Sequence, residues 1–233
     1  MTQISAQALD PPPAPLFHTH TTLVPPEHEP QTYIPSPSPS GMPTPSLKRP
    51  ITVRAAQPTT SDAEAIISIG RPVYAATFGP TCSEADLRDY LDSTYTSPLV
   101  LAELTDPNKQ FFIAVQDLLE ASNSLDTVVG FVQLTKGTTE PCLGEYDDII
   151  ELQRFYIALD HHGAGVAARL MEHTLSVAKQ QQYRHIWLGV YEHNHRARRF
   201  YQKYGFKSVG EHDFWVGSDR QTDIVCVREL VQE

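Results

Sequence analysis

The pattern of hydrophobic and polar residues changes near residue 50. Before that point apolar residues do not recur at the spacing of a helix or a strand. After it, residues 51–54 alternate between apolar and polar side chains, which predicts a short strand. Residues 59–62 are Thr, Thr, Ser and Asp, the types that cap helices, and they predict a helix that continues to about Phe78. Ser83 opens a second predicted helix.

The rest of the chain alternates between the two kinds of pattern. It predicts strands at 111–115 and 128–134 joined by a polar hairpin loop at 119–127, then a strand at 151–159, a helix at 165–181, a strand at 186–191, a helix at 195–204, and strands at 206–216 and 222–230. The predicted order is β-α-α-β-β-β-α-β-α-β-β. This order favours an α+β fold in which a mostly antiparallel, twisted sheet contains one central strand-helix-strand unit.

The composition divides the chain in the same place. Residues 1–50 hold most of the prolines, including the run 11–13. Such a segment buries too little apolar surface to offset its ordering entropy, so we predict a disordered, Pro/Ser-rich tail followed by one domain at 51–233. Ser36, Ser38 and Thr44 each precede a proline, which suits a docking or phosphorylation segment. A solvated leader without a specific partner is the interpretation that the composition favours, and the tail partner stays unknown.

Charge and cysteine content exclude several classes of protein. The 233 residues carry a formal net charge of -10, which argues against a nucleic-acid partner and is compatible with a cationic substrate. No apolar run approaches the roughly 20 residues of a membrane span, and no signal or transit peptide is evident. Cys82, Cys142 and Cys226 are odd in number and widely spaced, which indicates reduced thiols. We therefore expect a cytoplasmic protein without membrane contact.

A glycine-containing loop follows the predicted strand at 151–159 and opens a helix. Gly163 and Gly165 allow the backbone to approach a ligand closely, and a helix start offers unpaired N–H groups and a partial positive charge. This arrangement suits a pyrophosphate. The pattern Gly163-x-Gly165-x-x-Ala168, with Glu192 further on, also satisfies a dinucleotide fingerprint. However, only about 65 residues remain after the loop, too few for the further βα units that such a fold requires.

Two blocks together resemble the GNAT superfamily of N-acetyltransferases. The loop of that family, Gln/Arg-x-x-Gly-x-Gly/Ala, is matched by His162, Gly163, Ala164, Gly165, Val166 and Ala167, with His162 in place of the usual Gln or Arg. A second family block is matched by Asn194, Ala197, Phe200, Tyr201, Gly205 and Phe206. The resemblance implies the GNAT fold, with helices on both faces of the sheet, and acetyl-CoA as co-substrate without a metal. Family members are often monomers or homodimers.

The segments 187–194, 209–217 and 221–223 resemble a subgroup, the PaiA-type polyamine acetyltransferases. This closer resemblance implies a small-molecule amine, spermidine or spermine, as the acceptor. Two alternatives stay open. One is a protein or peptide N-acetyltransferase, and the other is a non-catalytic module that binds acyl-CoA.

The family resemblance also implies which residues bind acetyl-CoA. The loop residues 162–167 meet the pyrophosphate, mostly through backbone amides. Backbone groups of Phe155, Tyr156 and Ile157 pair with the pantetheine arm as an added strand would. Asn194 meets the same arm or caps the next helix. Lys203, with other basic residues of its helix, is the candidate contact for a phosphate.

Three residues are candidates for catalysis. Tyr201 occupies the family's acid position and would protonate the leaving thiolate. Glu151 is expected at the start of its strand, where related histone acetyltransferases carry their base. Glu192, at the end of the following strand, is the second candidate for base or substrate contact. His161, His193 and His195 lack the further ligands of a zinc site, so we predict no metal.

Overall fold

The computed structural model describes residues 50–116, 127–216 and 219–231. The predicted tail and most of the predicted hairpin loop at 119–127 lie outside these residues. The elements in chain order are β1 (Ile51–Ala55), α1 (Thr60–Phe78), η1 (Gly79–Thr81), α2 (Glu84–Thr94), α3 (Ser97–Thr105), β2 (Lys109–Gln116), β3 (Thr127–Thr135), η2 (Pro141–Leu143), β4 (Ile149–Ile157), η3 (Leu159–His161), α4 (Val166–Gln180), β5 (His185–Tyr191), α5 (His195–Lys203), β6 (Lys207–Val216) and β7 (Asp219–Glu229), where η marks a short 3-10 helix.

The strands form one seven-stranded sheet in the order β1-β2-β3-β4-β5-β7-β6. Every neighbouring pair is antiparallel except β4 and β5, which are parallel. The crossover between β4 and β5 is the helix α4, as a parallel connection requires. The predicted α+β fold with a mostly antiparallel sheet is therefore confirmed.

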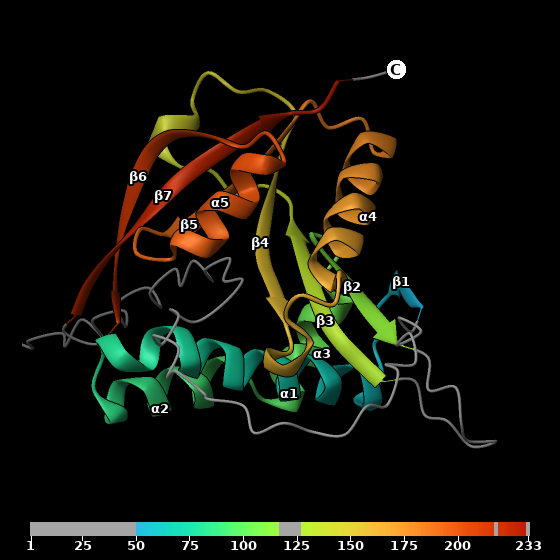
Figure 1. Cartoon of the computed structure of the whole chain (residues 1–233), viewed down its shortest axis with the longest axis vertical. Helices are drawn as coiled ribbons and strands as arrows, with labels where there is room; N and C mark the ends of the chain where they lie inside the picture. Colours follow the sequence, from blue (N-terminus) through green and yellow to red (C-terminus); the bar gives the residue numbers. More distant parts are fainter. Residues whose placement is uncertain (1–49, 117–126, 217–218, 232–233) are drawn as a thin grey trace, which may run out of the picture.

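Helices cover both faces of the sheet (Figure 1). On one face α4 and α5 pack on alternate residues of β2 to β5 and β7, forming a core that contains Leu152, Phe155, Leu170 and Tyr201. On the other face α1, α2 and α3 pack on the side chains that point the opposite way, among them Tyr156. This division follows from the strand period of two residues, because successive side chains of one strand point to opposite faces.

The first two helices begin where capping residues predict. The Thr59 hydroxyl accepts a hydrogen bond from the Asp62 amide at 3.3 Å, and the Ser83 hydroxyl accepts one from the Asp86 amide at 3.1 Å. Each bond satisfies one of the amides that a helix start leaves without a partner. The Asp62 carboxylate, buried behind the cap, also pairs with Arg54 of β1 and so ties α1 to the sheet.

Two predictions about this part of the chain are wrong. The predicted order lacks α3, a nine-residue helix whose Ser-Pro start places Pro98 in its first turn, where a proline is tolerated. The strand predicted at 151–159 runs instead from Ile149 to Ile157, because residues 149 and 150 also pair with β5. Glu151 is therefore the third residue of its strand and is buried, whereas a residue at the strand start was expected.

Candidate active site

The parallel strands β4 and β5 pair over a short distance and then separate (Figure 1). Ile149, Ile150 and Glu151 pair with His185, Ile186 and Trp187, and the described residues beyond them form no further pairs between these strands. Both strands continue for several residues after the last pair. The result is a gap in the middle of the sheet, with unpaired edges on both sides.

The loop after β4 leads to an uncapped helix start at the edge of this gap. Gly163 and Gly165 have φ angles of 80° and 90°, in the left-handed region that favours glycine. Gly165 is the N-cap of α4, and no side chain accepts a hydrogen bond there. A Cβ atom added at either glycine would meet nothing within 4 Å, and the first residues of α4 line a pocket. The loop therefore has the two left-handed glycines and the helix start without a side-chain cap on which the phosphate prediction depends, and phosphate binding stays a prediction.

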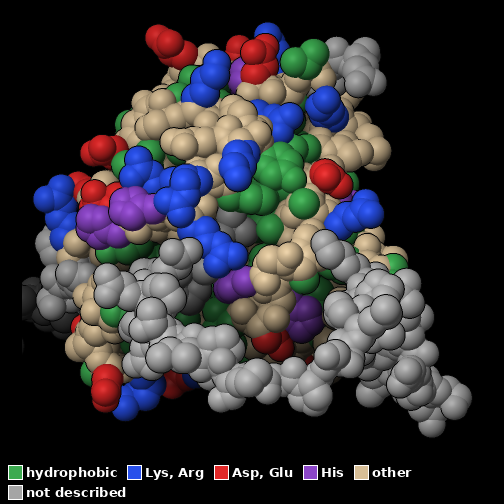
Figure 2. Space-filling model, in the orientation of Figure 1, with side chains coloured by type: hydrophobic (Ala, Val, Ile, Leu, Met, Phe, Trp, Pro, Cys, Tyr) green, Lys and Arg blue, Asp and Glu red, His purple; other side chains and the backbone are tan. Residues whose placement is uncertain are grey.

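A pocket of about 280 Å³ lies between the start of α4 and the start of α5. Its walls combine the end of β4, the loop, the first turn of α4 and two residues of α5; the lining residues are Ile157, His161, His162, Gly163, Gly165, Val166, Ala167, Ala168, Arg196 and Phe200. Arg196, Arg199 and Lys203 are exposed on α5, and Lys and Arg side chains gather on this face of the molecule (Figure 2). The pocket therefore has a positive rim, provided by a helix start and by Arg196.

His162, the residue at which the loop departs from the family pattern, lies inside the pocket wall. Its Nε2 atom is buried and has no hydrogen-bond partner among the described residues. Burial and the nearby charge of Arg196 lower the pKa of His162 below its ordinary value. The lowered pKa favours the neutral ring, which can form a hydrogen bond without adding charge to the pocket.

Asn194 joins the end of β5 to α5. Its Oδ1 atom accepts a hydrogen bond from the Ala197 amide at 3.0 Å, which confirms the predicted N-cap. The Nδ2 group of the same side chain is buried and has no partner among the described residues. The N-cap hydrogen bond therefore fixes the orientation of the Asn194 side chain, and its NH2 group can still donate hydrogen bonds to a ligand.

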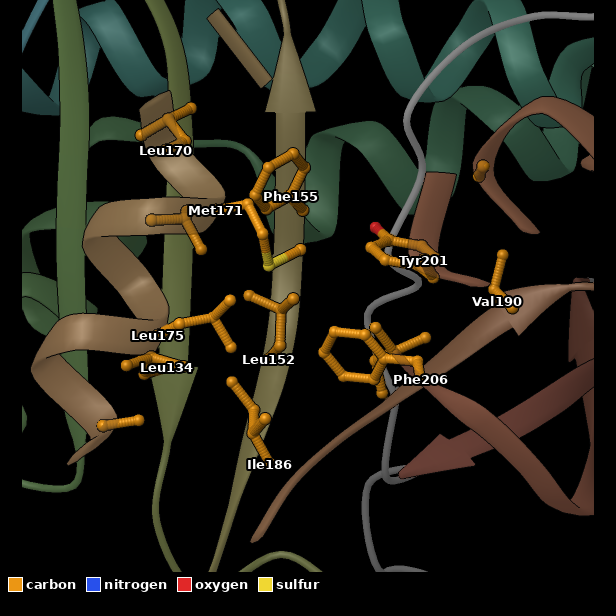
Figure 3. Close-up of a cluster of buried hydrophobic side chains, with 14 of the residues drawn as sticks. Leu134, Leu152, Phe155, Leu170, Met171, Leu175, Ile186, Val190, Tyr201 and Phe206 are labelled. Carbon is orange, nitrogen blue, oxygen red and sulfur yellow. The ribbon is translucent and has the colours of Figure 1, made fainter. Parts of the chain in front are cut away.

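Tyr201 lies in the core between α5 and β4, with 1% of its surface exposed. The rings of Phe155, Phe200 and Phe206 surround it, with centroids 5.6 to 6.3 Å away. Figure 3 shows its hydroxyl directed toward the β4 side of this cluster, and the hydroxyl has no hydrogen-bond partner among the described residues. Burial raises the pKa of Tyr201 well above its ordinary value, so the hydroxyl keeps its proton.

Glu151 lies at the last paired position before the strands separate. Its neighbours Ile150 and Leu152 point into the core under α4, so alternation places Glu151 on the opposite face of the sheet from Tyr201. Only 3% of Glu151 is exposed, and its Oε2 atom has no hydrogen-bond partner among the described residues. Burial raises the pKa of Glu151 to about 7, with the Thr138 hydroxyl and Arg154 opposing the rise.

Two more carboxylates contribute to that pKa. Glu140, just before η2, and Asp223, on β7, are both buried and both raise the pKa of Glu151 through charge repulsion. Sequence reasoning did not select either residue. The segment that contains Asp223 is part of the PaiA resemblance, and that was the only available signal for it. Among the described residues no three His, Cys, Asp or Glu side chains are arranged to hold a metal ion.

Of the remaining predicted site residues, some lie at the pocket and others do not. Ile157 lines the pocket, Phe155 faces Tyr201, and Tyr156 points to the opposite face, where it packs with the residues under α1. Glu192 follows β5 with a partly exposed side chain, 3.9 Å from His193. Lys203 and Ala164 are exposed and do not line the pocket. The predicted set did not include four residues that line the pocket: His161, Ala168, and Arg196 and Phe200 of α5.

Comparison with protein families gives a match to the acetyltransferase (GNAT) family over residues 74–206. An N-acetyltransferase of Mycobacterium tuberculosis is 30% identical over 171 residues, which cover 73% of this chain and 99% of the relative. The spermine/spermidine N(1)-acetyltransferase of Bacillus subtilis is 32% identical over 76 residues, which cover 30% of this chain and 50% of the relative.

Solved structures share the fold. The PaiA N-acetyltransferase from Thermoplasma acidophilum, in complex with coenzyme A, superposes with a TM-score of 0.57 at 20% identity, over 77% of this chain and 99% of that one. Arabidopsis thaliana NAA60, in complex with a bisubstrate analogue, superposes with a TM-score of 0.59 at 18% identity, over 77% and 98%. None of the described helices is long and apolar enough to cross a membrane.

Proposed function

Because the chain belongs to the acetyltransferase (GNAT) family, we propose that it moves the acetyl group of acetyl-CoA to a small amine, preferably a polyamine. One observation carries this proposal. The gap between β4 and β5 has an open, uncapped helix start at its edge, a buried tyrosine hydroxyl on one face and a buried carboxylate on the other.

The donor fits the residues present. The amides of residues 163–167 would bind the pyrophosphate, and Arg196 would contribute a positive charge. The unpaired edge of β4 at 155–157 would pair with the amide groups of the pantetheine arm, and the free Nδ2 of Asn194 lies at the end of the other edge. The thioester would then lie in the gap, because the arm leads from the pocket along β4.

The chemistry requires a base on the amine side and an acid on the thiol side. Glu151, with its pKa raised to about 7, takes the proton of the attacking amine directly or through one water. The neutral nitrogen attacks the thioester carbonyl, a C–N bond forms, and the C–S bond breaks. The nitrogen is positively charged after the attack and loses its second proton, while Tyr201 donates its own proton to the departing thiolate and receives one in exchange for the proton that the nitrogen has lost. Glu151 and Tyr201 lie on opposite faces of the sheet, so the base and the acid are kept apart.

The acceptor assignment is supported by charge and by one relative. The chain has a net charge of -10, and the face that carries Glu151 also carries the carboxylates of Glu140 and Asp223. A protonated polyamine is attracted to such a surface. The partial match to the Bacillus subtilis spermine/spermidine enzyme points to the same acceptor class.

The test is release of free thiol from acetyl-CoA with a panel of amines: spermidine, spermine, monoamines and peptides with free N-termini. We expect turnover with spermidine or spermine above that with peptides. Turnover with peptides alone would identify a protein or peptide N-acetyltransferase. Binding of acetyl-CoA without turnover of any acceptor would identify a non-catalytic module, and both results would refute the proposal.

A further inference from the structure

Three carboxyl groups come together on the face of the sheet opposite α4 and α5. Glu140, Glu151 and Asp223 are 7%, 3% and 3% exposed. The Nδ1 atom of His212 lies 3.0 Å from Oε2 of Glu140, and His212 is directly opposite Asp223 in the β6–β7 register. Glu151 lies close enough to both other carboxyl groups for each to raise its pKa.

A second observation, at Glu151, indicates that this cluster of carboxyl groups binds a ligand. Its Oε2 atom is buried and has no hydrogen-bond partner among the described residues. The guanidinium of Arg154, whose charge lowers the pKa of Glu151, is paired with Glu103 at 2.7 Å. A buried carboxylate oxygen without a partner is costly, and a ligand that donates hydrogen bonds would satisfy it.

The surroundings favour an elongated organic cation. Among the described residues no three His, Cys, Asp or Glu side chains are arranged so that they could hold a metal ion, and this argues against a compact metal ion as the ligand. Each of two carboxylates has an aromatic neighbour: Glu151 pairs with Trp187, and Asp223 pairs with Tyr191. Alternating negative groups and aromatic carbon surfaces match the ammonium groups and methylene segments of an aliphatic polyamine.

Gly189 leaves room for the Asp223 carboxylate near the gap. A Cβ atom at Gly189 would lie 2.9 Å from Oδ2 of Asp223, so the glycine leaves the space in which the carboxylate lies over β5. Gly189 is two residues beyond Trp187, the last residue of β5 that pairs with β4. The Asp223 carboxylate therefore lies beside the gap through which the acetyl group would pass.

We propose that Glu140 and Asp223 form an acceptor subsite that binds a second ammonium group of a di- or polyamine, while Glu151 meets the reacting nitrogen. This inference rests on the proposed function and makes it more specific. The enzyme would then select its acceptor by the distance between two amino groups, and a single amino group would not be enough.

The experiment compares spermidine with n-butylamine at saturating acetyl-CoA. Asp223→Asn and Glu140→Gln remove one charge each from the subsite, and Glu211→Gln is the matched control because Glu211 is an exposed carboxylate on the same strand as His212. We expect each subsite variant to lower kcat/KM for spermidine by about 10- to 100-fold, mainly through KM, as for loss of a charged hydrogen bond. The kcat/KM for n-butylamine should fall much less, since loss of one charge only lowers the pKa of Glu151. The KM for acetyl-CoA should stay unchanged, and Glu211→Gln should behave as the wild type.

Equal loss with both amines, or equal kcat/KM of the wild type for both, would overturn the subsite. A second measurement covers variants that do not fold. With coenzyme A present, spermidine should raise the melting temperature of the wild-type protein more than n-butylamine does, and an equal effect would also overturn the subsite. Absence of turnover with every amine would instead overturn the proposed function, and the melting temperatures would then decide on the subsite separately.

Discussion

Replacing Glu151 with Gln should make the protein more stable and less active at the same time. Glu151 is 3% exposed, and burial raises its pKa from 4.5 to about 7. A rise of that size corresponds to roughly 3 kcal/mol of preference for the protonated form in the folded protein. This free energy is the cost of burying the charged Glu151 carboxylate in the folded protein.

The direction with pH follows from proton binding. Between about pH 4.5 and 7 the folded protein holds a proton on Glu151 that the unfolded chain releases, so this group's contribution to stability falls as pH rises. Below pH 4.5 both states are protonated and the carboxyl resembles a glutamine. At pH 8 the charge is present in both states, and the full cost applies to the wild type only.

The assay is urea unfolding of the wild type and Glu151→Gln at pH 4.5, 6 and 8. We expect equal stability of the two proteins at the lowest pH and an excess for the variant that grows to roughly 3 kcal/mol at pH 8. In parallel, kcat/KM of the wild type should rise with pH through about pH 7, and the variant should lose activity by about 100-fold or more. A stability difference that does not change with pH would refute the reasoning.

Three further predictions concern other parts of the molecule. Tyr201→Phe should lower kcat by about 100-fold without changing the Kd for acetyl-CoA, and an unchanged kcat would remove the acid role. Its stability should not fall, since the hydroxyl has no partner among the described residues. Gly165→Ala should cost about 1 kcal/mol because of the φ of 90°, and should weaken acetyl-CoA binding in calorimetry. Gly137→Ala, with a φ of 78° away from the pocket, should show a similar stability cost with unchanged binding. Arg154→Ala should destabilise the protein by about 1.5 to 3 kcal/mol in urea, because it removes the charged hydrogen bonds from Arg154 to Glu103; a loss below about 0.5 kcal/mol would show that the ion pair between Lys109 and Glu103 is sufficient for that carboxylate.

Local patterns were enough to predict most of the fold. Helices α1, α2 and α4 begin with caps or a glycine loop, and each has a signal that depends only on neighbouring residues. Helix α3 was missed because most of its apolar residues are consecutive, at 98–102, so no helical face is distinguishable. Helix α3 packs on the sheet, and its Glu103 pairs with Arg154 of β4, which is fifty-one residues away in the sequence.

The candidate site divides in the same way. The loop glycines and Tyr201 belong to contiguous motifs, and the sequence identifies them directly. Glu140 and Asp223 approach Glu151 only after three separate segments fold together, and no local pattern encodes that meeting. Burial of Glu151 has the same origin, because it depends on two strand residues that precede the predicted strand start.

The short pairing of β4 with β5 has a consequence for how the molecule folds. Strands β1 to β4 are neighbours in the sheet and consecutive in chain order, so they can assemble through antiparallel contacts as soon as residue 157 has been synthesised. Strands β5 to β7 arrive later and join that unit in the sheet through only three residue pairs. Glu151 belongs to the early unit, whereas Tyr201 and Asp223 belong to the late one. Enzymatic activity therefore reports on the last step of folding, and a refolding experiment should recover strand and helix signals before it recovers acetyl transfer.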